Sequence, residues 1–316
     1  MTTEAIPNTA SLRELQQTPI ESVLQVIDQG LVHLPSYREL YYRWERQHWQ
    51  AREIDFSPDI MQWQQMDEDE QLDFIRIAAS FFQGEASVTD ALAPYVIAMP
   101  YEEMRFYATT QLVDESRHTI FFDRFFREVL QIDEGNIEEM LQFAQQFMNT
   151  SMRTILVDML IDMAERLGKE PQNRALLVEG VTLYHVVIEG TMALAGQRQL
   201  LEQCRKRKLF PGFRGGFTAV ARDESRHVIF GVKVLRDMIQ EDPMQAYVVQ
   251  RAIETYAPVA LDALAPVDAF IPLMLERHED PWEAQRYGLE SLRKKLKVIG
   301  LNIEVPALPI PDVPVF

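Results

Sequence analysis

The strongest constraint in this sequence is a short segment that occurs twice. Residues 114–121 read Asp-Glu-Ser-Arg-His-Thr-Ile-Phe and residues 223–230 read Asp-Glu-Ser-Arg-His-Val-Ile-Phe, so seven of eight positions are identical. Each copy contains the motif Glu-x-x-His, and residues three apart lie on the same face of a helix. Each copy therefore directs one carboxylate and one imidazole to the same side of a predicted helix.

A further glutamate precedes each copy in an apolar stretch. Glu85 lies 30 residues before Glu115, and Glu189 lies 35 residues before Glu224. Either distance suits two antiparallel helices with a connection between them. An unpaired glutamate would be costly to bury in such a stretch, and a bound metal ion would offset that cost.

Together these residues predict a dinuclear metal site in a helical bundle. One Glu from each of two helices and a Glu-x-x-His motif from each of two others form the ligand set of di-metal carboxylate bundles. Four carboxylates supply four negative charges to two divalent ions and can bridge them. The oxygen-rich, sulfur-free set suits iron or manganese. The predicted ligands are Glu85, Glu115, His118, Glu189, Glu224 and His227.

Several residues beside these ligands allow two interpretations each. Asp114 and Asp223 are either solvated charges or hydrogen-bond partners of the ligating histidines. Gly84 and Gly190 adjoin the lone glutamates, where they permit either close helix packing or substrate access. We expect ion-pair roles for Arg117 and Arg226, and structural roles for His33, His48, His185 and His278.

The rest of the chain predicts an all-α protein. Only 13 of 316 residues are glycine, and long segments place apolar residues three and four apart, which is typical of helices. No linker divides the chain, so we expect a single domain over 1–316. Its bundle core covers about 67–241, a helical N-terminal extension about 1–50, and an extended proline-rich tail about 305–316. The predicted helices lie at about 19–34, 36–50, 67–95, 100–131, 136–166, 172–205, 213–241, 244–276 and 280–297.

Composition excludes several classes of function. The chain has 31 Lys and Arg against 48 Asp and Glu, a net charge of −17. A field of that sign repels nucleic acid and anionic membrane surfaces. The apolar stretch at 257–275 contains two aspartates and three prolines, which argue against a membrane span. We therefore expect neither nucleic acid nor a membrane as a partner.

The single cysteine, Cys204, excludes an internal disulfide and a Cys-x-x-Cys site. Its three basic neighbours could lower its pKa, but cations at a helix C-terminus are the preferred interpretation. Residues 1–9 lack the basic and apolar regions of a signal peptide. A reducing cytoplasm is therefore the expected location.

The order Glu, Glu-x-x-His, Glu, Glu-x-x-His resembles the ferritin-like superfamily. Within it, the chain resembles the ribonucleotide reductase small-subunit-like group, and above all the R2-like ligand-binding oxidases. The resemblance runs from about Trp49 to Gly231. Its residues are Trp49, Ile54-Asp55-Phe56-Ser57, Gly84-Glu85, Val88-Thr89, Glu115 to His118, Tyr184, Ile188-Glu189-Gly190, Leu209-Phe210-Pro211-Gly212, Asp223 to His227 and Phe230-Gly231.

The resemblance implies an O2-dependent oxidoreductase that is a homodimer with a manganese–iron pair; di-iron is the alternative. Manganese would be held by Glu85, Glu115 and His118, iron by Glu189, Glu224 and His227, and Glu115 would bridge. Oxygen activation would join the Cβ of Val88 to the oxygen of Tyr184 as an ether. A long-chain fatty acid would bind with its carboxylate at the metals.

Spacing supports only half of the Val88–Tyr184 assignment. Val88 lies three residues after Glu85, on the same helical face. Tyr184 lies five residues before Glu189, and on an ideal α-helix five residues rotate a side chain about 140° away. Spacing alone would make Tyr184 a core residue. The chain also departs from the family by carrying Ala86 where a second glutamate commonly follows the ligand.

Three other functions stay open at this stage. A radical-generating ribonucleotide reductase small subunit commonly has a tyrosine four residues after the first ligand histidine, where this chain has Phe122, and a tyrosine in its tail, whereas the last tyrosine here is Tyr287. An acyl desaturase or amine oxygenase would share the metal frame. A non-catalytic ferritin-like metal-binding protein would also share it, although storage proteins are usually about half this length.

Overall fold

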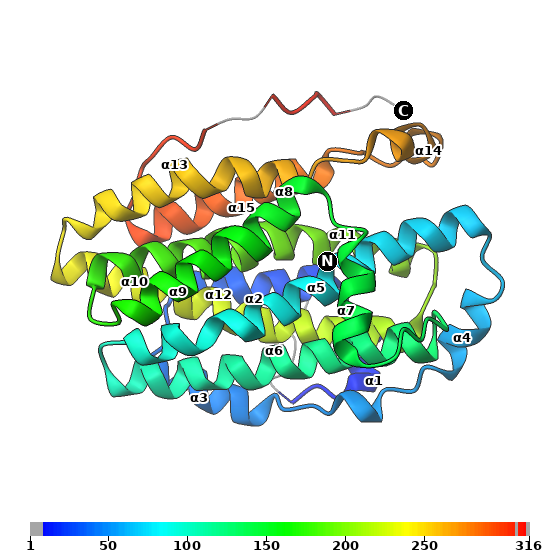
Figure 1. The fold of residues 1–316 in the computed structure, drawn as a ribbon, viewed down its shortest axis with the longest axis horizontal. Coiled ribbons are helices and arrows are strands. Elements are labelled where there is room, and N and C mark those ends of the chain that lie inside the picture. The colour runs from blue at the N-terminus through cyan, green and yellow to red at the C-terminus, as the bar shows by residue number, and fades with distance from the viewer. Residues whose placement is uncertain (1–8, 307–308, 314–316) are drawn as a thin grey trace.

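The computed structural model describes residues 9–306 and 309–313, and every regular element within these ranges is helical. The prediction of an all-α fold is therefore confirmed (Figure 1). The predicted single domain and its extensions remain predictions, and their residues 1–8, 307–308 and 314–316 lie outside the described part of the chain.

Four long helical runs form the bundle that carries the predicted ligands (Figure 1). The first pair, α5 and α6, pack against each other, and the helix holding η3 packs against α12. The third run is continuous from Arg174 to Lys206. The four runs are α5 (Glu68–Ala98), α6 (Glu102–Glu128), α10–η3–α11 (Arg174–Val181, Thr182–Ala193, Leu194–Lys206) and α12 (Pro211–Glu241).

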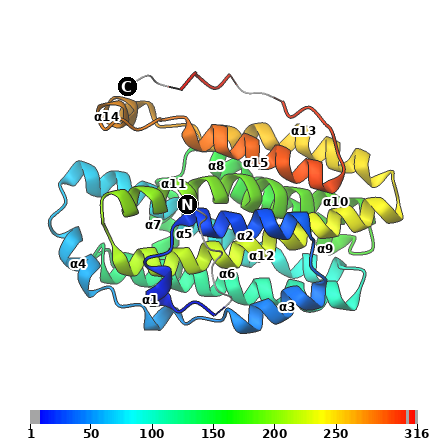
Figure 2. The ribbon, with the colours of Figure 1, turned by 180° about the vertical axis from the view of Figure 1, so that it is seen from behind.

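The remaining helices cover this bundle. Helix α2 packs on α12 and touches α15 and α11, and Figure 2 shows it between α15 and α12. Helix α3 packs on α6, α9 on α5, and both α13 and α15 on η3. Their bounds are α1 (Leu12–Leu15), α2 (Ile20–Val32), α3 (Tyr37–Arg46), η1 (Ala51–Glu53), α4 (Ser57–Trp63), α7 (Ile137–Gln145), α8 (Thr150–Arg153), η2 (Thr154–Met159), α9 (Leu160–Lys169), α13 (Gln245–Ala263), η4 (Asp268–Phe270), α14 (Ile271–Glu276) and α15 (Glu283–Ile299).

Local capping chemistry fixes where the ligand-bearing helices begin. The side chain of Asp67 accepts the N–H of Glu70 at 2.8 Å and starts α5. Pro211 occupies the first turn of α12, where a missing N–H costs nothing. The carboxylate of Asp59 accepts the N–H groups of Gly212 and Phe213 at 2.8 and 2.7 Å. This cap comes from α4, a helix that the periodicity did not predict.

Two predicted helices are broken in the structure. The run at 136–166 stops at Gln145, because Asn149 caps a new helix by accepting the N–H of Met152 at 2.7 Å. The run at 244–276 stops at Ala263; Pro266 lies in the connection that follows, and Pro272 stands in the first turn of α14. The prediction of one continuous helix was wrong in both cases, because a capping residue or a proline can end a helix even where the apolar spacing continues.

By length and composition, the helix Arg174–Lys206 could span a membrane, and α13 would pass the same test only together with the bent η4–α14 segment. The apolar window of Arg174–Lys206 is 89% buried within the protein. The apolar character of Arg174–Lys206 is therefore explained by its place in the core of the bundle.

Candidate metal centre

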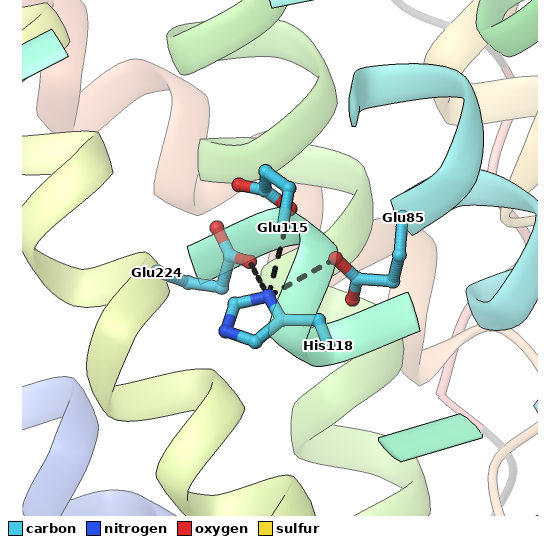
Figure 3. A group of neighbouring side chains, drawn as sticks. All are labelled: Glu85, Glu115, His118 and Glu224. Atoms are coloured by element: carbon cyan, nitrogen blue, oxygen red, sulfur yellow. Dashed lines mark hydrogen bonds and ion pairs between the residues drawn. The ribbon is translucent and has the colours of Figure 1, made fainter. Parts of the chain in front are cut away.

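The six predicted ligands converge in two overlapping groups inside the bundle. One group is Glu85, Glu115, His118 and Glu224, shown in Figure 3; the other is Glu115, Glu189, Glu224 and His227. Within each group the ligand atoms all lie within 4.8 Å of one another, and every residue is buried. Glu115 and Glu224 belong to both groups, so both carboxylates are placed between the two groups.

The first group is centred on Nδ1 of His118. That atom lies 3.1 Å from Glu85 Oε2, 3.4 Å from Glu224 Oε1 and 3.5 Å from Glu115 Oε2 (Figure 3). One nitrogen and three carboxylate oxygens converging on one point form a donor set that a divalent iron or manganese ion accepts.

The second group repeats this arrangement around Nδ1 of His227. That atom lies 3.1 Å from Glu189 Oε1, 3.1 Å from Glu115 Oε1 and 3.2 Å from Glu224 Oε2. The duplicated sequence therefore produces a duplicated geometry, with the shared carboxylates between the two halves.

The aspartate of each copy binds the histidine of the other. Nε2 of His118 lies 3.3 Å from Asp223 Oδ2, and Nε2 of His227 lies 3.1 Å from Asp114 Oδ2. Both carboxylates are fully buried. They are therefore partners of the histidines and not solvated charges, and they leave Nδ1 of each ring facing the glutamates.

Two arginines neutralise these aspartates. Arg226 donates to Asp114 at 3.0 Å and to Asp223 at 2.8 Å, while Arg117 donates to Asp223 at 2.9 Å and also to Asp114. Although burial alone would raise it, the charges of Arg226 and Arg117 hold the pKa of Asp223 well below its usual range. The predicted ion-pair roles are confirmed.

Two tryptophans also donate hydrogen bonds to these aspartates. The indole N–H of Trp49 donates to Asp223 at 2.7 Å, and that of Trp44 donates to Asp114 at 2.9 Å. Trp49 was among the residues of the resemblance, whereas Trp44 was missed. The repeat predicts partners in pairs, so a second tryptophan close in sequence to Trp49 was the available signal.

The buried carboxylates give the centre a negative charge that bound cations would offset. Burial raises the pKa values of Glu85 and Glu189 well above the usual carboxyl range, with further contributions from neighbouring glutamates. Burial would lower the pKa values of His118 and His227, but the adjacent carboxylates raise them well above the ordinary value. Oε2 of Glu189 is buried and has no hydrogen-bond partner in the described part of the chain. In the absence of metal, bound protons therefore offset the negative charge of the four glutamates. Two divalent ions would neutralise the same charge, so the donor set fits a metal pair.

Tyr184 reaches this centre because its helix is widened. Its hydroxyl donates to Oε1 of Glu115 at 3.0 Å. Segment η3 is π-helical, and its i→i+5 bonding places residues five apart one turn above each other. Tyr184 and Glu189 therefore share a face. Spacing on an ideal α-helix gave the wrong direction for Tyr184.

The two glycines beside the lone glutamates have different roles. A Cβ at Gly190 would lie 2.6 Å from Lys295 Cε and 2.8 Å from the backbone oxygen of His185, so close packing requires this glycine. A Cβ at Gly84 would meet only Leu156 Cδ1, at 3.6 Å. Gly84 instead lines a cavity that opens from the metal centre.

That cavity, of about 220 Å³, reaches the predicted ligands along the wall of α5. It is lined on this helix from Glu85 back to Asp73, and the twelve helical steps between these residues span about 18 Å. The wall between them is mostly apolar, and Val88 lies at the inner end. On the outer side, the segment between α13 and α15 covers the cavity, with Arg76 stacked over the ring of Phe270 at 5.3 Å.

The other histidines and the cysteine lie outside both ligand groups. Nε2 of His185 is 3.2 Å from the side chain of Gln111, in agreement with a structural role. Cys204 is buried, and burial raises its pKa to about 12 in spite of Arg214 and Arg207. Its basic neighbours therefore do not activate it.

A helical bundle with two such linked ligand groups belongs to the di-metal carboxylate proteins. Residues 32–259 match the family "Ribonucleotide reductase, small chain". The chain belongs to this family.

Solved structures of an R2-like ligand-binding oxidase share the fold. A glycine-to-leucine variant with an anaerobically reconstituted Mn/Fe cofactor has a TM-score of 0.72, and a valine-to-isoleucine variant with the same cofactor has 0.73. A tyrosine-to-phenylalanine variant with an aerobically reconstituted Mn/Fe cofactor has 0.72. Each is 22% identical in sequence, covering 84% of this chain and 93% of its own.

Proposed function

We propose that this protein is an oxidoreductase that activates O2 at a manganese–iron pair, with di-iron as the alternative. The observation that carries the proposal is the arrangement of His118 and His227, whose two ligand groups have Glu115 and Glu224 in common. These groups lie at the inner end of a mostly apolar cavity. The R2-like ligand-binding oxidase structures carry Mn/Fe cofactors, which supports the choice of metals.

The ligand roles follow the two groups. Glu85 and His118 would hold manganese, and Glu189 and His227 would hold iron. Glu115 and Glu224 would bridge, since each has one oxygen near either histidine. When bound, the metal pair supplies O2 activation and oxidising equivalents.

The chain's own residues would then determine where oxidation occurs. The hydrogen bond to Glu115 fixes the Tyr184 hydroxyl at the centre, and Val88 lies on the adjoining cavity wall. An ether between Val88 Cβ and Tyr184 Oη forms with loss of one C–H and one O–H bond. The two electrons and two protons go to the O2-derived oxidant. Both residues are at least 95% buried, which keeps water from competing.

We propose a long-chain fatty acid as the ligand of the cavity. Its carboxylate would replace solvent at the metals, and its chain would follow the apolar wall for about 18 Å from Glu85 towards Asp73. The structural neighbours are called ligand-binding oxidases, which supports an occupied cavity.

We further propose a cytoplasmic homodimer that forms through the outer face of α6. Phe106, Val113 and Ile120 are 56%, 48% and 51% exposed at seven-residue spacing, and Thr109 and Ser116 lie between them. A charge-free stripe lets two copies of an acidic chain meet without opposing like charges. A Val113→Glu variant should elute as a monomer; if it keeps the wild-type mass in light scattering, this face is not the interface.

The decisive experiment is reconstitution of metal-free protein with manganese and iron in air, followed by proteolysis and mass spectrometry. A Val88–Tyr184 linked peptide, two hydrogens lighter than its parts, is the expected result. The Tyr184→Phe protein is the matched control, because it lacks the oxygen that forms the ether. Metal-loaded, air-exposed protein without the link would contradict the proposed two-electron chemistry.

A radical-generating small subunit is the second candidate, and the family match favours it. Phe122, which is fully buried, stands at the position of the usual radical tyrosine. Metal-loaded protein that lacks the cross-link but supports ribonucleotide reduction with a large subunit would establish this alternative.

A further inference from the structure

A separate cavity of about 100 Å³ lies between α2, α11 and α15. It shares no lining residue with the cavity at the metal centre. Leu24, Ile27, Leu31 and Leu194 form the apolar part of its wall, and the rest comes from Asp28, Tyr287, Glu290, Ser291, Lys294 and Lys295.

Lys295 is the unusual residue of this cavity. It is 1% exposed, and among the described residues its Nζ donates to Ser291 alone, at 2.5 Å to Oγ and 3.4 Å to the backbone oxygen. No carboxylate of the described residues lies within ion-pair distance of it. A buried ammonium without a counter-ion is costly. Burial accordingly lowers the pKa of Lys295 to about 7, against the opposing charge of Asp28.

The surrounding structure holds this amine in place. The Lys295 stem lies directly on the Cα of Gly190, where any Cβ would approach Cε to 2.6 Å. Ser291 Oγ in turn donates to the backbone oxygen of Gly190 at 2.9 Å. The unprotonated amine is the form of a lysine side chain that acts as a nucleophile towards carbonyl groups, and burial beside apolar side chains increases its share.

The charged residues that line the cavity determine which carbonyl compounds Lys295 could bind. Lys294 is paired with Glu290 at 3.4 Å, which leaves the carboxylate of Asp28 beside the cavity; Tyr287 is the remaining titratable lining residue. An anionic ligand, or an anionic adduct such as a carbamate, would oppose Asp28 and the net charge of −17. A neutral carbonyl compound and its neutral imine would not.

We propose that Lys295 captures small aliphatic aldehydes as an imine in this cavity. The Nζ lone pair attacks the carbonyl carbon, and the carbonyl oxygen leaves as water with the two N–H protons, so that a C=N bond replaces C=O. The volume sets the size limit, since an apolar cavity of about 150 Å³ accommodates benzene. Unbranched aldehydes of three or four carbons fit the space beside Lys295.

Reductive trapping tests this proposal independently of the metal chemistry. Full-length protein is incubated with butanal and cyanoborohydride at pH 7, and the seven lysines are compared by peptide mass spectrometry. We expect Lys295 to be butylated at least tenfold faster than its neighbour Lys294, whose side chain is 53% exposed. Equal or slower modification of Lys295 would overturn the proposal.

Two controls separate capture in the cavity from general reactivity. A Leu24→Phe variant reduces the cavity and keeps the amine. If its melting temperature is unchanged, most of the excess rate of Lys295 butylation over Lys294 butylation should be lost. Branched pivalaldehyde should modify Lys294 but not Lys295 in the wild type. If Leu24→Phe or pivalaldehyde leaves the preference intact, the cavity does not bind the aldehyde.

Discussion

Asp223 binds the histidine of the other sequence repeat, with Oδ2 3.3 Å from Nε2 of His118. Asp114 returns the contact to His227 at 3.1 Å. The two repeats therefore do not form two separate sites. Each supplies the support for the other's ligand, so damage to either copy affects both metal positions.

Replacing Asp223 by Asn should weaken metal binding about 10- to 100-fold, as is typical for partners of ligating histidines. The amide keeps the shape but loses the charge that orients His118. Metal affinity measured by competition with a chelator tests this expectation. Exposed Asp158→Asn is the matched control. A folded Asp223→Asn protein with wild-type affinity would show that this contact does not support the ligand.

Metal loading should release protons, and apparent affinity should rise with pH through neutrality. The pKa values of Glu85, Glu189, His118 and His227 all lie well above their ordinary values in the metal-free site. These groups must lose their protons to bind metal. Titration with Mn²⁺ in weakly buffered solution should therefore acidify the medium. Absence of proton release, with metal shown to be bound, would contradict the assigned ligands.

The sequence repeat was sufficient to predict that the six proposed ligands come together, because residues three apart share a face on an ordinary α-helix. It was insufficient for Tyr184, because apolar spacing does not distinguish the π-helical bonding of η3 from that of an α-helix. The long helices were likewise predictable from apolar spacing. Their breaks at Asn149 and Pro266 were not, because caps and prolines act locally against an apolar pattern that continues past them.

Enlarging Gly84 should close the cavity without unfolding the protein. A leucine side chain there would project into the space beside Glu85 that the aliphatic ligand would occupy, since only Leu156 lies near the added Cβ. We expect Gly84→Leu to lose bound fatty acid, detected by mass spectrometry of extracted ligand, while Gly84→Ala retains it. Wild-type ligand content in folded Gly84→Leu would place the ligand elsewhere.

Gly231→Ala should destabilise the protein by about 1–3 kcal/mol through overpacking. The added Cβ would lie 2.1 Å from the Cβ of His185, which cannot move away as a flexible chain end would. Gly84→Ala is the matched control, since it also changes a helical glycine but has room, and it should be neutral or stabilising by up to about 1 kcal/mol. Chemical denaturation of both variants gives the comparison, and equal effects would contradict the packing argument.

Buried His185 should make the metal-free protein less stable in acid. Burial, assisted by the charge of His227, lowers the pKa of His185 from 6.5 to about 3, so the unfolded chain binds a proton there that the folded chain does not. The stabilisation is complete above pH 6.5 and is lost as pH falls towards 3, at up to about 1.4 kcal/mol per pH unit. His185→Gln should remove this slope in denaturation curves recorded between pH 4 and 6.5, whatever its effect on absolute stability. The exposed His33→Gln variant should follow the wild type. An unchanged slope in His185→Gln would mean that another group sets the acid limit of this fold.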